Sequence, residues 1–305
     1  MVKKNPKTSN WIIVILILLS LYLLSAILAN FVSLFSAVPE TPSGNVAIIP
    51  IKGAIMSDAA DSAFGISTMS STDIIGLIEK AEAEKTIKAV IFEINSPGGS
   101  AVASEELVNA IASMNKTSVA WIREVGASGA YWAASATDHI VASRMSATGS
   151  IGVLSSYIEV AGFLQEHNVT YRSLTAGEFK EMQSPFKELT PEEEKLILAR
   201  LDKVHDYFID SVLEFRGIDA SDDFTEGQIL LGSEALELGL IDEIGSKDQA
   251  VEHIEKELNI TADLARYEMK KNFLEMLGTL SANHGYFLGK GIGDLEIPGN
   301  LAVKT

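Results

Sequence analysis

The sequence predicts an α/β protein in which helices flank a mainly parallel sheet and a transmembrane helix precedes the sheet. Short β-branched apolar runs alternate with amphipathic helical segments between residues 46 and 258. The runs are apolar throughout, which is typical of strands covered on both faces. Right-handed crossovers are expected between such strands. An uncharged run over residues 11–38 indicates the transmembrane helix.

The N-terminal run is long enough to cross a bilayer, because about 20 apolar residues span the hydrocarbon core as a helix. A cleavable signal peptide has a shorter apolar region, about 7–15 residues, followed by a small-x-small site. The stretch LFSAVPE is a poor cleavage site. We therefore predict an uncleaved anchor at residues 11–34.

The charges around the anchor predict its orientation. Three lysines precede it, and Glu40 is the first charge after it. The positive-inside rule then predicts a single-pass protein of the cell membrane, with residues 1–10 in the cytoplasm and the chain beyond the linker at 35–45 outside it.

Composition excludes several kinds of site. The chain of 305 residues has no cysteine, which excludes disulfides, thiolate zinc sites and a cysteine nucleophile. Beyond the three N-terminal lysines, 41 acidic residues face 21 basic ones, a formal charge of −20. This charge argues against binding nucleic acid or anionic lipid headgroups.

The elements follow one another in strand–helix order. Strands are predicted at 46–55, 87–94, 118–124, 139–143 and 171–175, and helices at 71–85, at 99–115 and from about residue 128. A long helix starts at the cap Thr190, with Pro191 at its first position and Glu193 completing a capping box, and Gly217 ends it. A short helix, a strand and a helix at 246–258 follow.

Two loops that follow predicted strands carry candidate chemistry. In INSPGGS, Gly98 and Gly99 expose backbone N–H groups at a helix start, as an oxyanion cradle or as an ordinary turn. In VGASGAYWAAS, small residues flank Ser128, which is either a nucleophile or part of a closely packed helix start. If the loops are neighbours, the N–H groups of Gly99 and Gly129 converge on one oxygen beside Ser128.

A serine nucleophile requires a base. None of the five histidines lies in a turn or beside an orienting carboxylate, so a Ser-His-Asp triad is neither supported nor excluded. Lys180 lies in TAGEFKEMQSP, outside the charged helical faces. As a base it needs its pKa lowered from about 10.4 by apolar burial. An ordinary solvated lysine remains the alternative.

Five blocks in order carry a resemblance to a known family. They are INSPGGS, GASGAYWAAS, ATGSIGV, AGEFKEMQSPFKELTPEEE and EGQILLGSEALELGLIDEIG, and the resemblance spans residues 45–268. Together they resemble the short, single-anchor form of signal peptide peptidase, the SppA type. This is a serine peptidase of the Clp protease/crotonase fold group.

The resemblance implies roles for residues that match the family's motifs. Ser128 matches the nucleophile, and Lys180, 52 positions later, matches the general base of a Ser–Lys dyad. Gly99 and Gly129 match the oxyanion hole, and Ser150 matches the serine that orients the lysine. No metal or other cofactor is implied.

One position departs from the family pattern. Ala130 stands where a second glycine is usual, and its methyl group is expected to narrow the pocket.

The resemblance also implies a biological setting. It implies cleavage of remnant signal peptides and other short apolar peptides at the membrane surface, by a homo-octamer whose dyads are completed across subunit boundaries. The catalytic domain would span residues 46–270. Residues 271–305 would form a tail that is disordered, lies in the peptide groove or is trimmed by the enzyme itself.

Two rival functions remain open. One is a crotonase-type acyl-CoA enzyme on the same fold, which the anchor and the acidic charge disfavour. The other is a membrane scaffold that has lost catalysis, which the presence of both Ser128 and Lys180 disfavours.

Overall fold

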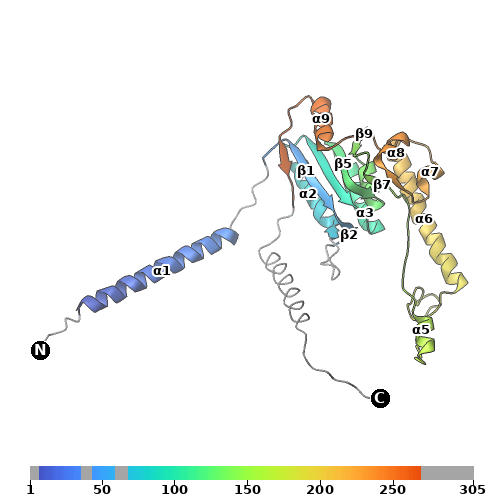
Figure 1. The fold of residues 1–305 in the computed structure, drawn as a ribbon, viewed down its shortest axis with the longest axis horizontal. Helices are drawn as coiled ribbons and strands as arrows, with labels where there is room; N and C mark the ends of the chain where they lie inside the picture. The colour runs from blue at the N-terminus through green and yellow to red at the C-terminus, as the bar shows by residue number, and fades with distance from the viewer. Residues whose placement is uncertain (1–6, 36–42, 59–67, 269–305) are drawn as a thin grey trace, which may run out of the picture. The chain divides into compact units, whose positions relative to one another are not determined.

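The computed structural model describes residues 7–35, 43–58 and 68–268 (Figure 1). The chain divides into two compact units, and the sheet lies within the unit Pro42–Met269. The predicted tail at 271–305 lies outside the described residues.

The N-terminal helix α1 spans Lys7–Phe35. Its window Trp11–Leu28 has a mean hydropathy of 2.8, and none of these residues is buried by the described protein. By length and composition this helix is able to cross a membrane.

The main sheet is mostly parallel. Its strands run in the order β10–β1–β4–β5–β6–β9, with β7 parallel to β5 and only β8 antiparallel, against β7. The strands are β1 Val46–Lys52, β4 Ala89–Ser96, β5 Thr117–Ala127, β6 His139–Ala142, β7 Ala147–Gly149, β8 Ile229–Leu231, β9 Glu243–Ile244 and β10 Leu264–Arg266. A small parallel pair joins β2 Ala54–Met56 to β3 Thr68–Ser70. The predicted α/β class with a mainly parallel sheet is confirmed.

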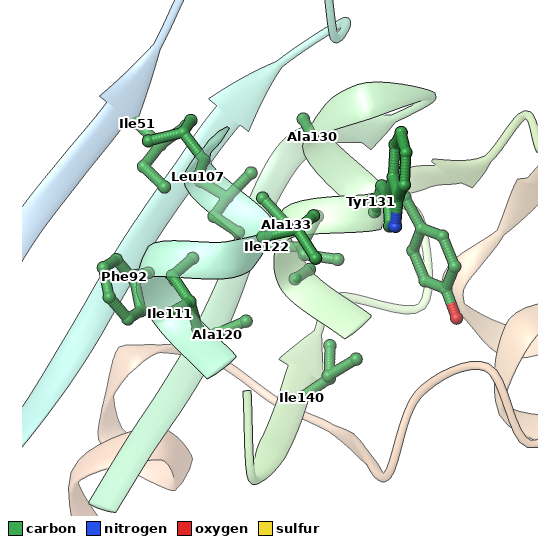
Figure 2. Packing of buried hydrophobic residues seen from close by; sticks show 14 of the residues in the cluster. Ile51, Phe92, Leu107, Ile111, Ala120, Ile122, Ala130, Tyr131, Ala133 and Ile140 are labelled. Carbon is green, nitrogen blue, oxygen red and sulfur yellow. The ribbon is translucent and has the colours of Figure 1, made fainter. Parts of the chain in front are cut away.

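Helices pack on both faces of this sheet. In β1, Ala47, Ile49 and Ile51 join the larger apolar core, whereas Val46 and Ile48 join the smaller one. The larger core includes residues of α2 Ser71–Ala83, α3 Ala101–Ala112, α4 Gly129–Ser135 and α6 Pro191–Arg216, and the smaller one includes residues of α9 Lys247–Leu258. Figure 2 shows side chains of the larger core, with α4 contributing Ala130, Tyr131 and Ala133. Two faces of apolar side chains explain why the strand sequences show little alternation.

The long helix α6 begins and ends where the sequence predicts. Thr190 Oγ1 accepts a hydrogen bond from Glu193 N, and the Glu193 carboxylate accepts one from Thr190 N. Gly217 closes the helix in the left-handed region, at φ +62°. The capping box and the glycine stop are both confirmed.

Two predicted strands differ from the structure. Residues 171–175 form no strand, and the predicted strand 46–55 is divided at Gly53, where φ is +85°. The short helix and strand expected after Gly217 are α8 Gly232–Glu237 and β9. The strands β7, β8 and β10 and the helices α5 Ala161–Glu166 and α7 Asp222–Thr225 were not predicted.

Between β7 and α6 the chain forms a segment that we call the arm, residues 153–190. It contains α5 and several exposed apolar side chains, among them Leu154 at 82%, Ile158 at 80% and Leu174 at 101% of full exposure. The exposed arm lacks the regular apolar pattern of a buried strand. For this reason the strand predicted at 171–175 does not form.

Candidate active site

Ser128 occupies a sharp turn between β5 and α4. Its backbone lies at φ +53° and ψ −130°, a conformation that residues other than glycine rarely adopt. Hydrogen bonds hold the turn on both sides, from Ser128 N to Gly149 O at 2.8 Å and from Trp132 N to Ser128 O at 3.0 Å. Backbone strain of this kind costs about 1–3 kcal/mol and is found most often at functional sites.

The glycine loop after β4 is fixed against β2. Ile55 N donates to Gly98 O at 2.9 Å, and Ser100 N donates to Ile55 O at 2.8 Å. A side chain on Gly99 would place its Cβ 2.0 Å from Ile55 O, so only glycine fits here. The loop therefore has a fixed position relative to the sheet.

The glycine loop and the serine turn touch each other. A Cβ built on Gly98 would lie 2.7 Å from Gly129 N, and one built on Gly129 would lie 3.6 Å from Gly99 N. Within the described part of the chain, neither the Gly99 N–H nor the Gly129 N–H donates a hydrogen bond. Two neighbouring N–H groups beside a serine are therefore able to bind one oxygen atom.

A pocket of about 800 Å³ opens beside Ser128. Gly99, Gly129 and Ser150 also line it, and its apolar wall consists of Trp132, Val153, Leu154, Val204 and Phe208. The rings of Trp132 and Phe208 stack with centroids 4.9 Å apart, and Trp132 Nε1 donates to Ser211 Oγ at 2.7 Å. The pocket therefore joins a hydroxyl and two N–H donors to an apolar surface held in place by α6.

Ser150 lies one residue after the strand that holds the serine turn. Its backbone is also left-handed, at φ +51°, and its N–H donates to Gln228 O at 2.7 Å. The structure thus brings together four of the five residues that the sequence singled out: Ser128, Gly99, Gly129 and Ser150.

Lys180, the fifth residue, lies elsewhere in the single chain. It is exposed on the arm, where its N–H donates to Gly177 O at 3.2 Å, and it does not line the Ser128 pocket. Within one chain, the amine does not enter the Ser128 pocket.

His205 is a pocket residue that sequence reasoning missed. It lines the pocket from α6, and its Nε2 atom lies 3.0 Å from Ile151 O. A helical signal was available, because His205 precedes the buried Phe208 by three positions and so shares its face of α6.

The expectation for Ala130 is wrong. Its side chain is fully buried in the larger core, and Ala130 does not line the pocket (Figure 2). The methyl group therefore fills core space behind the turn and does not narrow the site.

Over residues 7–35, 43–58 and 68–268, no group of three or more His, Asp or Glu side chains is placed to hold a metal ion.

The site can be compared with known proteins. Residues 110–261 match peptidase family S49. A relative from Methanocaldococcus jannaschii, provisionally named a protease, is 30% identical over 226 residues, which cover 72% of each chain. A relative from Enterococcus faecium, provisionally named a signal peptide peptidase SppA, is 29% identical over 218 residues, which cover 70% of this chain and 63% of that protein. Protease 4 of Haemophilus influenzae is 30% identical over 225 residues, 72% of this chain but 36% of that protein, so the chain spans about a third of it.

Proposed function

This chain belongs to peptidase family S49 and is a serine-type peptidase, and from that membership we propose that Ser128 is the nucleophile and that apolar peptides are its substrates. One observation carries the proposal: the strained serine lines a partly apolar pocket beside two N–H groups that donate to no described residue. Donors that no described residue accepts are available to bind a substrate oxygen in this pocket.

The proposed reaction follows from this geometry. Ser128 Oγ attacks the carbonyl carbon of a peptide bond while a neutral base accepts the hydroxyl proton. The N–H groups of Gly99 and Gly129 donate to the developing oxyanion, and one such donor stabilises the transition state by about 2.7–4 kcal/mol. The base then protonates the leaving amine, and water releases the acyl group from Ser128.

We assign the base to Lys180 of a neighbouring copy. Lys180 is exposed on an arm whose Leu154, Ile158 and Leu174 are also exposed, and such a surface is suited to contact with another protein. Burial of the arm in an apolar contact would favour the uncharged amine that a base requires. Ser150, beside Ser128, would then orient that amine. A closed ring of copies, proposed as a homo-octamer, supplies one such contact for each site.

Mixed assemblies test this assignment. Ser128→Ala and Lys180→Ala are each expected to abolish casein hydrolysis and Ser128→Ala to abolish labelling by a serine-directed probe, both with an unchanged fold. Co-expressed in equal amounts, the two variants should recover about a quarter of the parent activity, because one site in four pairs an intact serine with an intact lysine. A mixture as inactive as either variant would place both groups in one chain. Parent-like activity in both variants would refute the peptidase assignment.

The anchor completes the proposal. Helix α1 would hold the enzyme in the cell membrane through residues 11–34, with the N-terminus in the cytoplasm and the peptidase domain outside. The substrates would then be remnant signal peptides and other short apolar peptides released at the membrane surface. Protease added to intact spheroplasts should digest the domain, whereas protection of the domain would reverse the proposed orientation.

A further inference from the structure

We infer that Glu226 selects substrates by charge, so that the Ser128 pocket prefers apolar peptides with a basic side chain close to the cleaved bond and disfavours acidic ones. This inference rests on the proposed function of the same site.

Glu226 belongs to the wall of the pocket through its loop. Its N–H donates to Gln228 Oε1 at 3.0 Å, and Gln228 O accepts from Ser150 N at 2.7 Å. A Cβ built on Gly152 would lie 3.0 Å from the Cα atom of Gly227. The loop at 226–228 therefore packs directly against the segment that follows β7.

Glu226 is the source of formal charge among the described residues that line the pocket. It alone of them carries a formal charge at neutral pH, and His205 is the other titratable group. The Glu226 side chain is exposed and makes no hydrogen bond or ion pair with any described residue. A bound peptide thus meets a carboxylate that no cation within residues 43–58 or 68–268 neutralises.

The chemistry of the pocket then defines a substrate class. Trp132, Val204 and Phe208 offer an apolar surface, and Glu226 adds a negative charge to the same lining. A peptide that joins an apolar stretch to a lysine or arginine satisfies both, and secretory signal sequences have this composition. A peptide with an acidic residue at the same place would be repelled.

A peptide series tests the inference in the full chain, solubilised in a non-ionic detergent. Fluorogenic peptides share one apolar sequence and carry lysine, glutamine or glutamate at one position, which is moved stepwise away from the cleaved bond. At one or two positions, Glu226→Gln should reduce the lysine-to-glutamate ratio of kcat/KM by about three- to tenfold, as expected for a partly solvated charge pair. Glu226→Lys should reverse the preference, and added salt should weaken it in the parent.

Asp223→Asn is the matched control. Asp223 lies three positions earlier, is exposed, and does not line the pocket, yet its change alters the net charge by the same amount. It should leave the ratio unchanged. An equal shift in both variants would attribute selection to the overall acidic charge, and an unchanged ratio in Glu226→Gln at every position would overturn the inference.

A binding measurement separates this inference from the proposed function. In the Ser128→Ala background, fluorescence anisotropy gives the Kd of the same peptides without turnover. Charge-dependent binding that Glu226→Gln removes would support the inference even without cleavage by the parent. Cleavage without charge preference would refute the inference and leave the peptidase proposal standing. Neither binding nor cleavage of any peptide would refute both.

Discussion

The Nε2 atom of His205 lies 3.0 Å from the carbonyl oxygen of Ile151 and links helix α6 to the segment beside the serine turn. Three consecutive residues of this segment are each held by a hydrogen-bonding contact, and the one at Ile151 comes from α6. Gly149 O accepts from Ser128 N, Ser150 N donates to Gln228 O, and Ile151 O faces the imidazole. Because a carbonyl only accepts, Nε2 carries the proton in this contact. Helix α6 therefore helps to fix the position of the nucleophile.

We expect His205→Leu to reduce both stability and kcat, because it removes a partly buried hydrogen bond worth about 0.5–1.5 kcal/mol. His205→Gln should retain most of both, since its amide nitrogen is able to donate to the same carbonyl. Urea denaturation and steady-state kinetics measure the two effects. Asp206→Asn, an exposed neighbour on α6, serves as the control. Equal losses in the leucine and glutamine variants would contradict a role for the hydrogen bond.

The conformation of Ser128 predicts that two inactive variants differ in stability. Ser128→Gly and Ser128→Ala should both be inactive, since each lacks the hydroxyl. The glycine variant should be about 1 kcal/mol more stable than the alanine variant, because a Cβ is disfavoured at φ +53°. Thermal unfolding of the two variants measures this difference. Equal melting temperatures would show that the turn is not strained.

Close packing at Gly129 predicts that a substitution at Ser104 restores stability lost by a substitution at Gly129. A Cβ at Gly129 would lie 2.0 Å from Ser104 Oγ and 2.8 Å from Ser104 Cβ. Gly129→Ala should therefore cost about 1–3 kcal/mol of stability, as overpacked positions do. Adding Ser104→Gly removes both clashing atoms and should restore part of the loss. A double-mutant cycle measures this coupling, and strictly additive effects would argue against the contact.

Acid should weaken the sheet through Glu93. This residue of β4 is 3% exposed and lies 2.8–2.9 Å from the cationic groups of Lys52, Arg123 and Arg266. Burial alone would raise the pKa of Glu93, but Lys52 and Arg266 outweigh burial and hold this pKa below its usual value. A lowered pKa stabilises the fold above the unfolded-state value of about 4.3, and this stabilisation is lost as the pH falls through the folded-state pKa.

Glu93→Gln tests this pH dependence. Near pH 7 it should be less stable than the parent by about 1–3 kcal/mol, as for loss of hydrogen bonds to charged groups. The difference should begin to shrink below the unfolded-state pKa of about 4.3 and disappear only as the pH falls through the lower folded-state pKa of Glu93. Urea midpoints between pH 3 and 8 measure the difference. A difference that stays constant across this range would show that the ionised form of Glu93 is not what stabilises the sheet.

Local signals predicted most of the fold. The capping box at Thr190 and Glu193 and the glycine stop at Gly217 depend on neighbours within a few positions, and both are present. Apolar runs located β1, β4, β5 and β6 because those strands are buried on both faces. The strands β7, β8 and β10 have three residues each, too few to show a period. Their pairing depends on partners far along the chain.

Only the part of the site that is formed by short loops was predicted from the sequence. Gly99 and Gly129 stand out because turns after strands require glycine, and the structure places them together. His205 and Glu226 reach the pocket from distant elements, so only the packing of α6 and of the loop at 226–228 reveals them. The place of Lys180 depends on contacts between copies, which remain a proposal.

The pairing of β1 with β10 has a consequence for how the domain assembles. Val46 lies opposite Leu264, and Asn45 contacts Thr261 and Asp263. During synthesis, one edge of β1 therefore stays unpaired until some 200 further residues have been made and β10 has emerged from the ribosome. Until then that edge is able to pair with strands of other chains. A chain truncated before β10 is therefore expected to aggregate, even though it contains every pocket residue named above.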